Sequence, residues 1–147
     1  MDKTASNKNV LQTTFQTCDM GVSAINDIYN SIKDERLIIL ILKQKDKYEE
    51  IMQKCQKMST KYKLNVKELN AFVKASSYVS IKVKSMFNST TAHLCEMLIQ
   101  GTTMGITSLL KTMGENDAAD EKIRQTATDL QSAMEEFVDS LKVLLVK

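Results

Sequence analysis

The chain has 147 residues, which suits one domain with an adequate core, and its formal net charge is +2. It has no proline and only four glycines, while strong helix formers are abundant, so an all-α domain is expected. Three cysteines without close pairs argue against a disulfide framework and favour a reducing compartment. The N-terminus lacks an apolar signal region, and the longest apolar run, residues 37–42, is far below the roughly 20 residues of a membrane span. We therefore expect a soluble, cytoplasmic protein with no transmembrane segment.

The middle of the chain is basic. Residues 33–84 carry 13 Lys and Arg against six Asp and Glu, whereas residues 85–147 carry five against nine. Acidic residues alternate with the lysines around Asp46, and no arginine cluster with aromatic residues accompanies them. This pattern is typical of a solvated helix face, and no nucleic-acid partner is expected.

Two helices are predicted in the first half of the chain. The first begins at a cap formed by Asn7 or Asn9 and reaches about residue 32. The second opens at Asp34 and Glu35, where acidic side chains suit a helix N-terminus, and extends to about residue 62. In both helices the inward residues recur every three or four positions, which predicts the seam of a helical bundle. These seams are Leu11, Phe15, Cys18, Val22, Ile25, Tyr29 and Ile32, then Leu37, Ile41, Gln44, Tyr48, Ile51, Cys55, Met58 and Tyr62.

Three further helices are expected in the second half. Residues 65–87 form an outer helix diluted by serines. Residues 88–91 supply hydroxyl caps for a central helix over residues 92–113, for which Gly114 is the expected C-terminal stop. Acidic residues between positions 117 and 121 open the last helix. The seams of these last two helices are Cys95, Ile99, Thr102, Ile106, Leu109 and Met113, then Ile123, Ala127, Leu130, Met134, Phe137, Leu141 and Leu144.

The seams repeat within the chain. Adding 84 to Leu11 gives Cys95, adding 86 to Leu37 gives Ile123, and the following seam positions match in the same way. The repeat predicts two similar hairpins, residues 7–62 and 91–146. If they pack about a pseudo-twofold axis, their link must run the length of the bundle, and residues 65–87 as a helix would span about 35 Å. One long crossover between two hairpins is the ferritin-like topology.

Two sequence motifs accompany this helix order. They are Cys18-Asp-Met-Gly21 and His93-Leu-Cys-Glu-Met-Leu-Ile-Gln-Gly-Thr-Thr-Met-Gly105. With the helix order, they resemble a group of small bacterial ferritin-like four-helix-bundle proteins of unassigned function. The resemblance covers nearly the whole chain. It implies a single-domain ferritin-like four-helix bundle with a helical crossover, and it implies no activity.

The chain lacks the ligands of a ferritin-like di-metal centre, which takes a Glu from each of two helices and Glu-x-x-His from each of the other two. His93 is the single histidine, and Thr90 stands where the motif needs Glu. Gln44 takes an inward position on the second helix, with Tyr48 and Thr102 as candidate hydrogen-bond partners. No di-metal centre and no cofactor are therefore expected. His93 and Glu96, at i and i+3, remain the candidate metal ligands, against a capping or surface role for His93.

Three methionines lie off the seams. Met20, Met97 and Met104 stand two places beyond seam residues and should therefore face away from the bundle axis. Two explanations remain open. The crossover helix covers these side chains, or they form a self-association or ligand surface.

Three glycines lie beside these methionines, at Gly21, Gly101 and Gly105. A glycine inside a helix costs about 0.5–1 kcal/mol relative to alanine, unless a close approach uses the missing side chain. A tight helix contact is therefore predicted at these positions.

No catalytic motif, phosphate-binding glycine loop or nucleotide fingerprint is present in the sequence. We expect a non-enzymatic interaction or structural module that acts as a homo-oligomer or by binding a protein partner. The alternative is a ferritin-like metal-binding or redox protein with a non-standard or lost metal centre, which would use His93, Glu96 and a cysteine.

Overall fold

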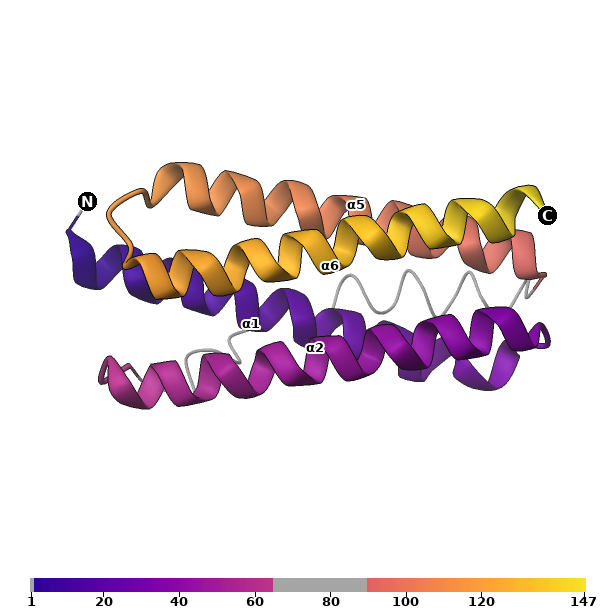
Figure 1. Ribbon diagram of the computed structural model, residues 1–147, viewed down its shortest axis with the longest axis horizontal. Helices are drawn as coiled ribbons and strands as arrows, with labels where there is room; N and C mark the ends of the chain where they lie inside the picture. The colour runs from indigo at the N-terminus through magenta and orange to yellow at the C-terminus, as the bar shows by residue number, and fades with distance from the viewer. Residues whose placement is uncertain (1, 65–89) are drawn as a thin grey trace.

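The computed structural model describes residues 2–64 and 90–147, and the long helices within them pack as a four-helix bundle (Figure 1). The predicted outer helix over residues 65–87 lies outside the described residues. No helix in the described part has a stretch long and apolar enough to span a bilayer. The helices are α1, Lys3–Ile28, which continues into the 3-10 turn η1, Tyr29–Ser31; α2, Glu35–Lys61; α5, Thr91–Glu115; and α6, Glu121–Val146.

Side-chain caps determine where three of the helices begin. Asp2 accepts a hydrogen bond from the backbone N–H of Ala5 at 2.8 Å, so α1 begins four residues before the predicted cap at Asn7. Asp34, where α2 was expected to open, is its cap, and hydrogen bonds from the Arg36 side chain lower the pKa of its carboxyl to about 2. Thr90 provides the predicted hydroxyl cap of α5.

The expected stop at Gly114 is wrong, because α5 continues through this residue to Glu115. Arg124 of α6 donates hydrogen bonds to the carbonyls of Met113 and Asn116 at 3.1 and 3.0 Å. The amide of Asn116 donates to the carbonyl of Thr112 at 2.8 Å. These side chains satisfy the terminal carbonyls, so the helix end needs no left-handed glycine.

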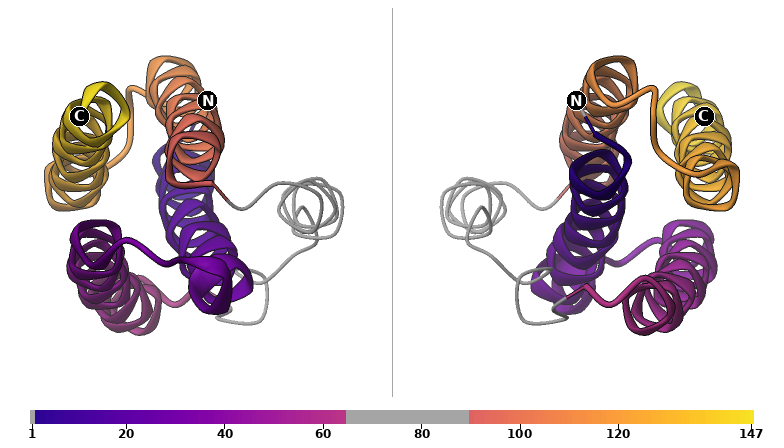
Figure 2. Two further views of the ribbon diagram at one scale, coloured as in Figure 1. Left: turned by 90° about the vertical axis from the view of Figure 1, so that its right-hand side faces the viewer. Right: turned by 90° about the vertical axis from the view of Figure 1, so that its left-hand side faces the viewer.

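The helices pair as two antiparallel hairpins, α1 with α2 and α5 with α6, and the hairpins lie side by side with α2 against α6 and α1 against α5 (Figures 1 and 2). α2 ends and α5 begins at opposite ends of the bundle (Figure 1). Thus α1 and α6 point in one direction, and α2 and α5 point in the other.

The predicted seams form the core. Every seam residue named above is buried or half-buried except Tyr29, which is 41% exposed because the chain leaves α1 for η1 at this position. The spacing of apolar residues therefore predicted the inward face of all four helices correctly.

The prediction of a central helix over residues 92–113 is wrong. α1 and α6 each contact the three other long helices, whereas α5 contacts mainly α6 and α1, and none of the residues of α1 from Ala5 to Ile25 is exposed. α5 has a solvent-facing side that includes Gln100, Gly101 and Thr103. Both helices carry the same seam spacing, so spacing alone did not distinguish them.

Candidate functional site

A buried polar layer interrupts the apolar core. Gln44, Tyr48 and Thr102 are each at most 9% exposed. The amide of Gln44 donates to the carbonyl of Ala133 on α6 at 3.5 Å, and the side chains of Gln44 and Thr102 lie near the Tyr48 hydroxyl. Burial raises the pKa of Tyr48 to about 12, so its hydroxyl stays protonated at neutral pH. Tyr48 and Thr102, the predicted partners of Gln44, thus lie in the same buried layer as its amide.

The Tyr48 ring packs against the backbone of α1 at Gly21. A Cβ placed on Gly21 would lie 2.4 Å from Cε2 of this ring, closer than real Cβ contacts allow. Here the missing side chain makes room for an aromatic ring.

Replacing Gln44 with leucine is expected to change the free energy of unfolding by less than about 1 kcal/mol. The change removes both the amide and the cost of desolvating it. Gln44→Glu is the matched comparison and should cost more, about 2 kcal/mol or above, because it buries a carboxyl group. Urea denaturation of both variants measures the difference. A Leu variant that lost several kcal/mol would show that the amide itself is required.

Among the residues that the structure describes, the candidate metal ligands do not meet a third ligand. His93 is half-buried on the first turn of α5, where its backbone N–H donates to the Thr90 hydroxyl at 3.3 Å, and Glu96 is exposed. Within residues 2–64 and 90–147, no three His, Cys, Asp or Glu side chains are grouped so that they could hold a metal ion.

The three cysteines are buried free thiols. Burial raises the pKa of Cys18 well above its ordinary value, raises that of Cys55 to about 12, and raises that of Cys95. The thiolate is the nucleophile and the metal ligand, so these protonated thiols behave as small apolar core residues.

The off-seam methionines do not share one environment. Met97 is buried, Met20 is half-buried, and Met104 on α5 is 72% exposed. The explanation that the crossover helix covers these methionines involves residues outside the described ranges. Met104 itself is largely exposed.

The predicted tight glycine contact occurs at Gly21 and is absent at Gly101. Gly101 is exposed, and a Cβ there would meet no atom within 4 Å. A Cβ on Gly105 would lie 3.4 Å from Thr17 and 3.5 Å from Met134, which is ordinary van der Waals contact. Alanine would therefore fit at Gly105, although a larger side chain would not fit without movement of its neighbours.

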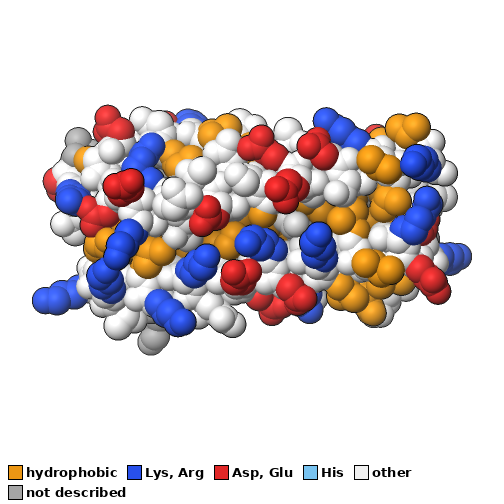
Figure 3. Space-filling view, viewed as in Figure 1, with side chains coloured by type: hydrophobic (Ala, Val, Ile, Leu, Met, Phe, Trp, Pro, Cys, Tyr) orange, Lys and Arg blue, Asp and Glu red, His pale blue; other side chains and the backbone are white. Residues whose placement is uncertain are grey.

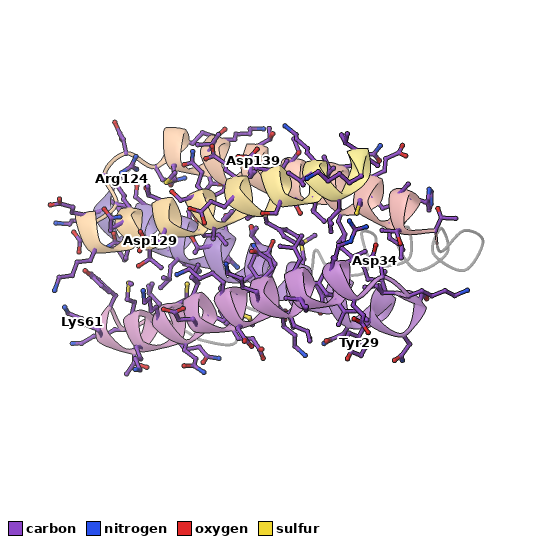
Figure 4. All side chains as sticks on the ribbon, turned by 45° about the vertical axis from the view of Figure 1, so that its right-hand side comes forward. Tyr29, Asp34, Lys61, Arg124, Asp129 and Asp139 are labelled. Atoms are coloured by element: carbon purple, nitrogen blue, oxygen red, sulfur yellow. The ribbon has the colours of Figure 1, made fainter. Side chains whose placement is uncertain are left out.

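A second polar cluster joins α1, α2 and α6 at the end of the bundle where the N-terminus lies. The Asp120 carboxylate pairs with Lys3 at 2.6 Å, and the Tyr62 side chain lies near it. The backbone N–H of Asp120 donates to Asn7 at 2.7 Å. Figure 4 shows Lys61 and Arg124 at this end of the bundle, and Tyr29 and Asp34 at the other. Asp120 is the N-cap residue of α6. Its carboxylate pairs with Lys3 of α1 and accepts no capping hydrogen bond.

Removing Lys3 is expected to raise the pKa of Asp120. The Lys3 ammonium is the main cause that holds this pKa below the ordinary value of 3.8, so Lys3→Gln should move it back toward that value. Since the folded pKa is the lower one, the ionised carboxylate contributes stability above about pH 4, which is lost as the pH falls through the folded pKa. Carboxyl-carbon NMR titration measures the shift, with Lys111→Gln on α5 as the control. An unchanged Asp120 titration would contradict the pairing.

Exposed aliphatic side chains gather at the opposite end of the bundle. Ile39 and Leu42 on α2 are 69% and 39% exposed, and Val143 and Val146 on α6 are 52% and 86% exposed. Figure 3 shows apolar side chains gathered at its right-hand end, over the start of α2 and the end of α6. These four residues are the apolar end surface. Like Met104, these residues lie off the seams. Searching for every apolar residue off a seam, and not only for methionines, would have marked them in the sequence.

Comparisons of the chain with protein-family models, with curated proteins and with solved structures find no match.

Proposed function

We propose that this protein is a non-enzymatic interaction module that binds a protein partner or a second copy of itself through the apolar end surface. The observation that carries this proposal is the grouping of four exposed aliphatic side chains on two adjacent helices. Grouped exposed apolar residues mark interaction sites, whereas single ones are normal on protein surfaces.

The test combines two measurements on the full chain. Sedimentation velocity detects self-association, and selection from a library of helical peptides on the immobilised protein detects partner binding. We expect at least one of these to give binding that Ile39→Lys combined with Val143→Lys abolishes. Met104→Lys, a change at an exposed apolar residue on α5, is the control and should leave binding unchanged. If neither measurement gives binding that depends on Ile39 and Val143, the proposal is wrong.

We also infer that the helix order is ferritin-like. The opposite positions of the end of α2 and the start of α5 support this inference, because the link between them must cross the length of the bundle (Figure 1). The repeat of the two hairpin seams supports it as well. An experimental structure in which α2 and α5 point in opposite directions would contradict it.

A metal-binding or redox function is the competing proposal. The buried polar residues of the described part of the chain, which include Gln44 and Thr102, contain no Glu and no His, so they do not match the Glu and Glu-x-x-His ligand set. This composition favours the interaction module. Elemental analysis of the purified protein separates the two, because stoichiometric iron, copper or zinc would favour the metal protein.

A further inference from the structure

The charges beside the apolar end surface differ between its two helices. On α6, residues 130–141 contain Glu135, Glu136 and Asp139, all exposed, and no basic residue. On α2, Lys43 and Lys47 lie on the side of the helix that carries Gln44, the residue that contacts α6. Figure 3 shows basic side chains on the part of α2 next to α6, opposite acidic side chains on α6.

These lysines and carboxylates do not pair with each other within the described part of one chain. Lys47 pairs with Glu50 of its own helix at 3.7 Å. No ion pair joins Lys43 to Glu136 or Asp139. Within the described residues, Lys43, Glu136 and Asp139 are therefore available to a partner.

The contact between Gln44 and Ala133 fixes the relative height of the charged residues on α2 and α6. Lys43 lies one residue from Gln44 toward the apolar end, and Glu136 lies three residues from Ala133 in the same direction. At about 1.5 Å per residue, Lys43 and Glu136 differ in height by roughly 3 Å. Ile39 and Val143 lie further toward the same end.

We infer that the occupant of this face is a second copy of the chain, related by a twofold axis parallel to the bundle. This inference rests on the proposed function and names its partner. Rotation about such an axis leaves each residue at the same position along the length of the bundle. It places α2 of each copy against α6 of the other. The apolar end surfaces then meet each other, and Lys43 of each copy comes to within about 3 Å of the height of Glu136 of the other.

The antiparallel alternative fits the same face less well. An axis perpendicular to the bundle places α2 against α2 and carries the apolar end of one copy to the far end of the other. There Ile39 would meet the exposed Lys57 and Lys61, which have no acidic neighbour within residues 51–64. Apolar burial and charge pairing therefore agree only in the parallel arrangement.

Charge reversal tests the arrangement, with the dimer dissociation constant from sedimentation velocity as the measurement. Lys43→Glu with Lys47→Glu should weaken the dimer at least about tenfold, and so should Glu136→Lys with Asp139→Lys, because each change opposes like charges. Mixing the two double variants should restore a heterodimer to within about threefold of the wild-type constant, since both contacts of the mixed pair are then complementary. Lys111→Glu on α5 is the control and should leave the constant unchanged.

Two outcomes would overturn the inference and leave the proposed function to its own test. A chain that stays monomeric at about 100 μM has no such dimer, but it could still bind peptides through Ile39 and Val143. A dimer that Ile39→Lys with Val143→Lys abolishes, but that the charge variants and their mixture do not change, has another arrangement. Circular dichroism and thermal unfolding confirm that each variant is folded before its association is measured.

Discussion

Replacing Gly21 with valine is expected to lower the free energy of unfolding by about 2–3 kcal/mol. The first added carbon would lie 2.4 Å from the Tyr48 ring, so the ring must move. Movement of the ring would also disturb its hydroxyl contacts with Gln44 and Thr102. Urea denaturation monitored by circular dichroism measures the loss.

Gly101→Val is the matched control for this prediction. It makes the same chemical change in a helix interior, but no atom lies within 4 Å of the added carbon. Its unfolding free energy should stay within about 0.5 kcal/mol of wild type, because valine is a slightly better helix former than glycine. Equal effects at the two positions would mean that the contact between Gly21 and Tyr48 does not matter to stability.

Removing the Tyr48 side chain should have the largest effect, a loss of about 3–5 kcal/mol for Tyr48→Ala. The ring is 3% exposed, so its loss leaves a cavity beside α1, and the Gln44 amide and Thr102 hydroxyl lose a buried polar neighbour. Tyr29→Ala is the control, because Tyr29 is 41% exposed and should cost less than about 1 kcal/mol.

The effects of Gly21→Val and Tyr48→Ala on the free energy of unfolding should not be additive, which allows a sharper test. In the Gly21→Val background the valine can fill part of the space left by the ring, so Tyr48→Ala should cost about 1–2 kcal/mol less than it does alone. Strictly additive losses would contradict direct packing between the two residues.

The inward faces of the helices were predictable because they depend on local spacing. Leu37, Ile51 and Leu130 were assigned to the core from intervals of three and four, and all three are buried. Tyr48 was likewise a predictable partner of Gln44, because residues four apart on a helix lie on the same face.

The helix ends were less predictable because they depend on contacts between helices. Asn7 was expected to cap α1, but its side chain binds the backbone of Asp120, 113 residues away in the sequence. Gly114 was expected to end α5, but Arg124 of the next helix satisfies the carbonyls there. No local pattern contains these partners.

The candidate interaction surface was also only partly predictable from the sequence. Methionine enrichment directed attention to Met104, whereas a group of exposed apolar side chains lies on α2 and α6 and includes Ile39 and Val143. Which helices lie side by side depends on how the hairpins pack. Sequence spacing could therefore show that Ile39 and Val143 lie off the seam, but not that they are neighbours.

The enclosure of α1 makes the two hairpins unequal, although their seams repeat. Separating the hairpins would expose residues of α1 that contact α5 and α6, whereas α5 already has one side in water. Backbone amides in α1 from Ala5 to Ile25 should therefore exchange their hydrogens with solvent most slowly, through global opening of the bundle, while amides on the outer side of α5 should exchange through smaller local openings. A repeated sequence would then fold as one cooperative unit, with its first helix as the most protected part.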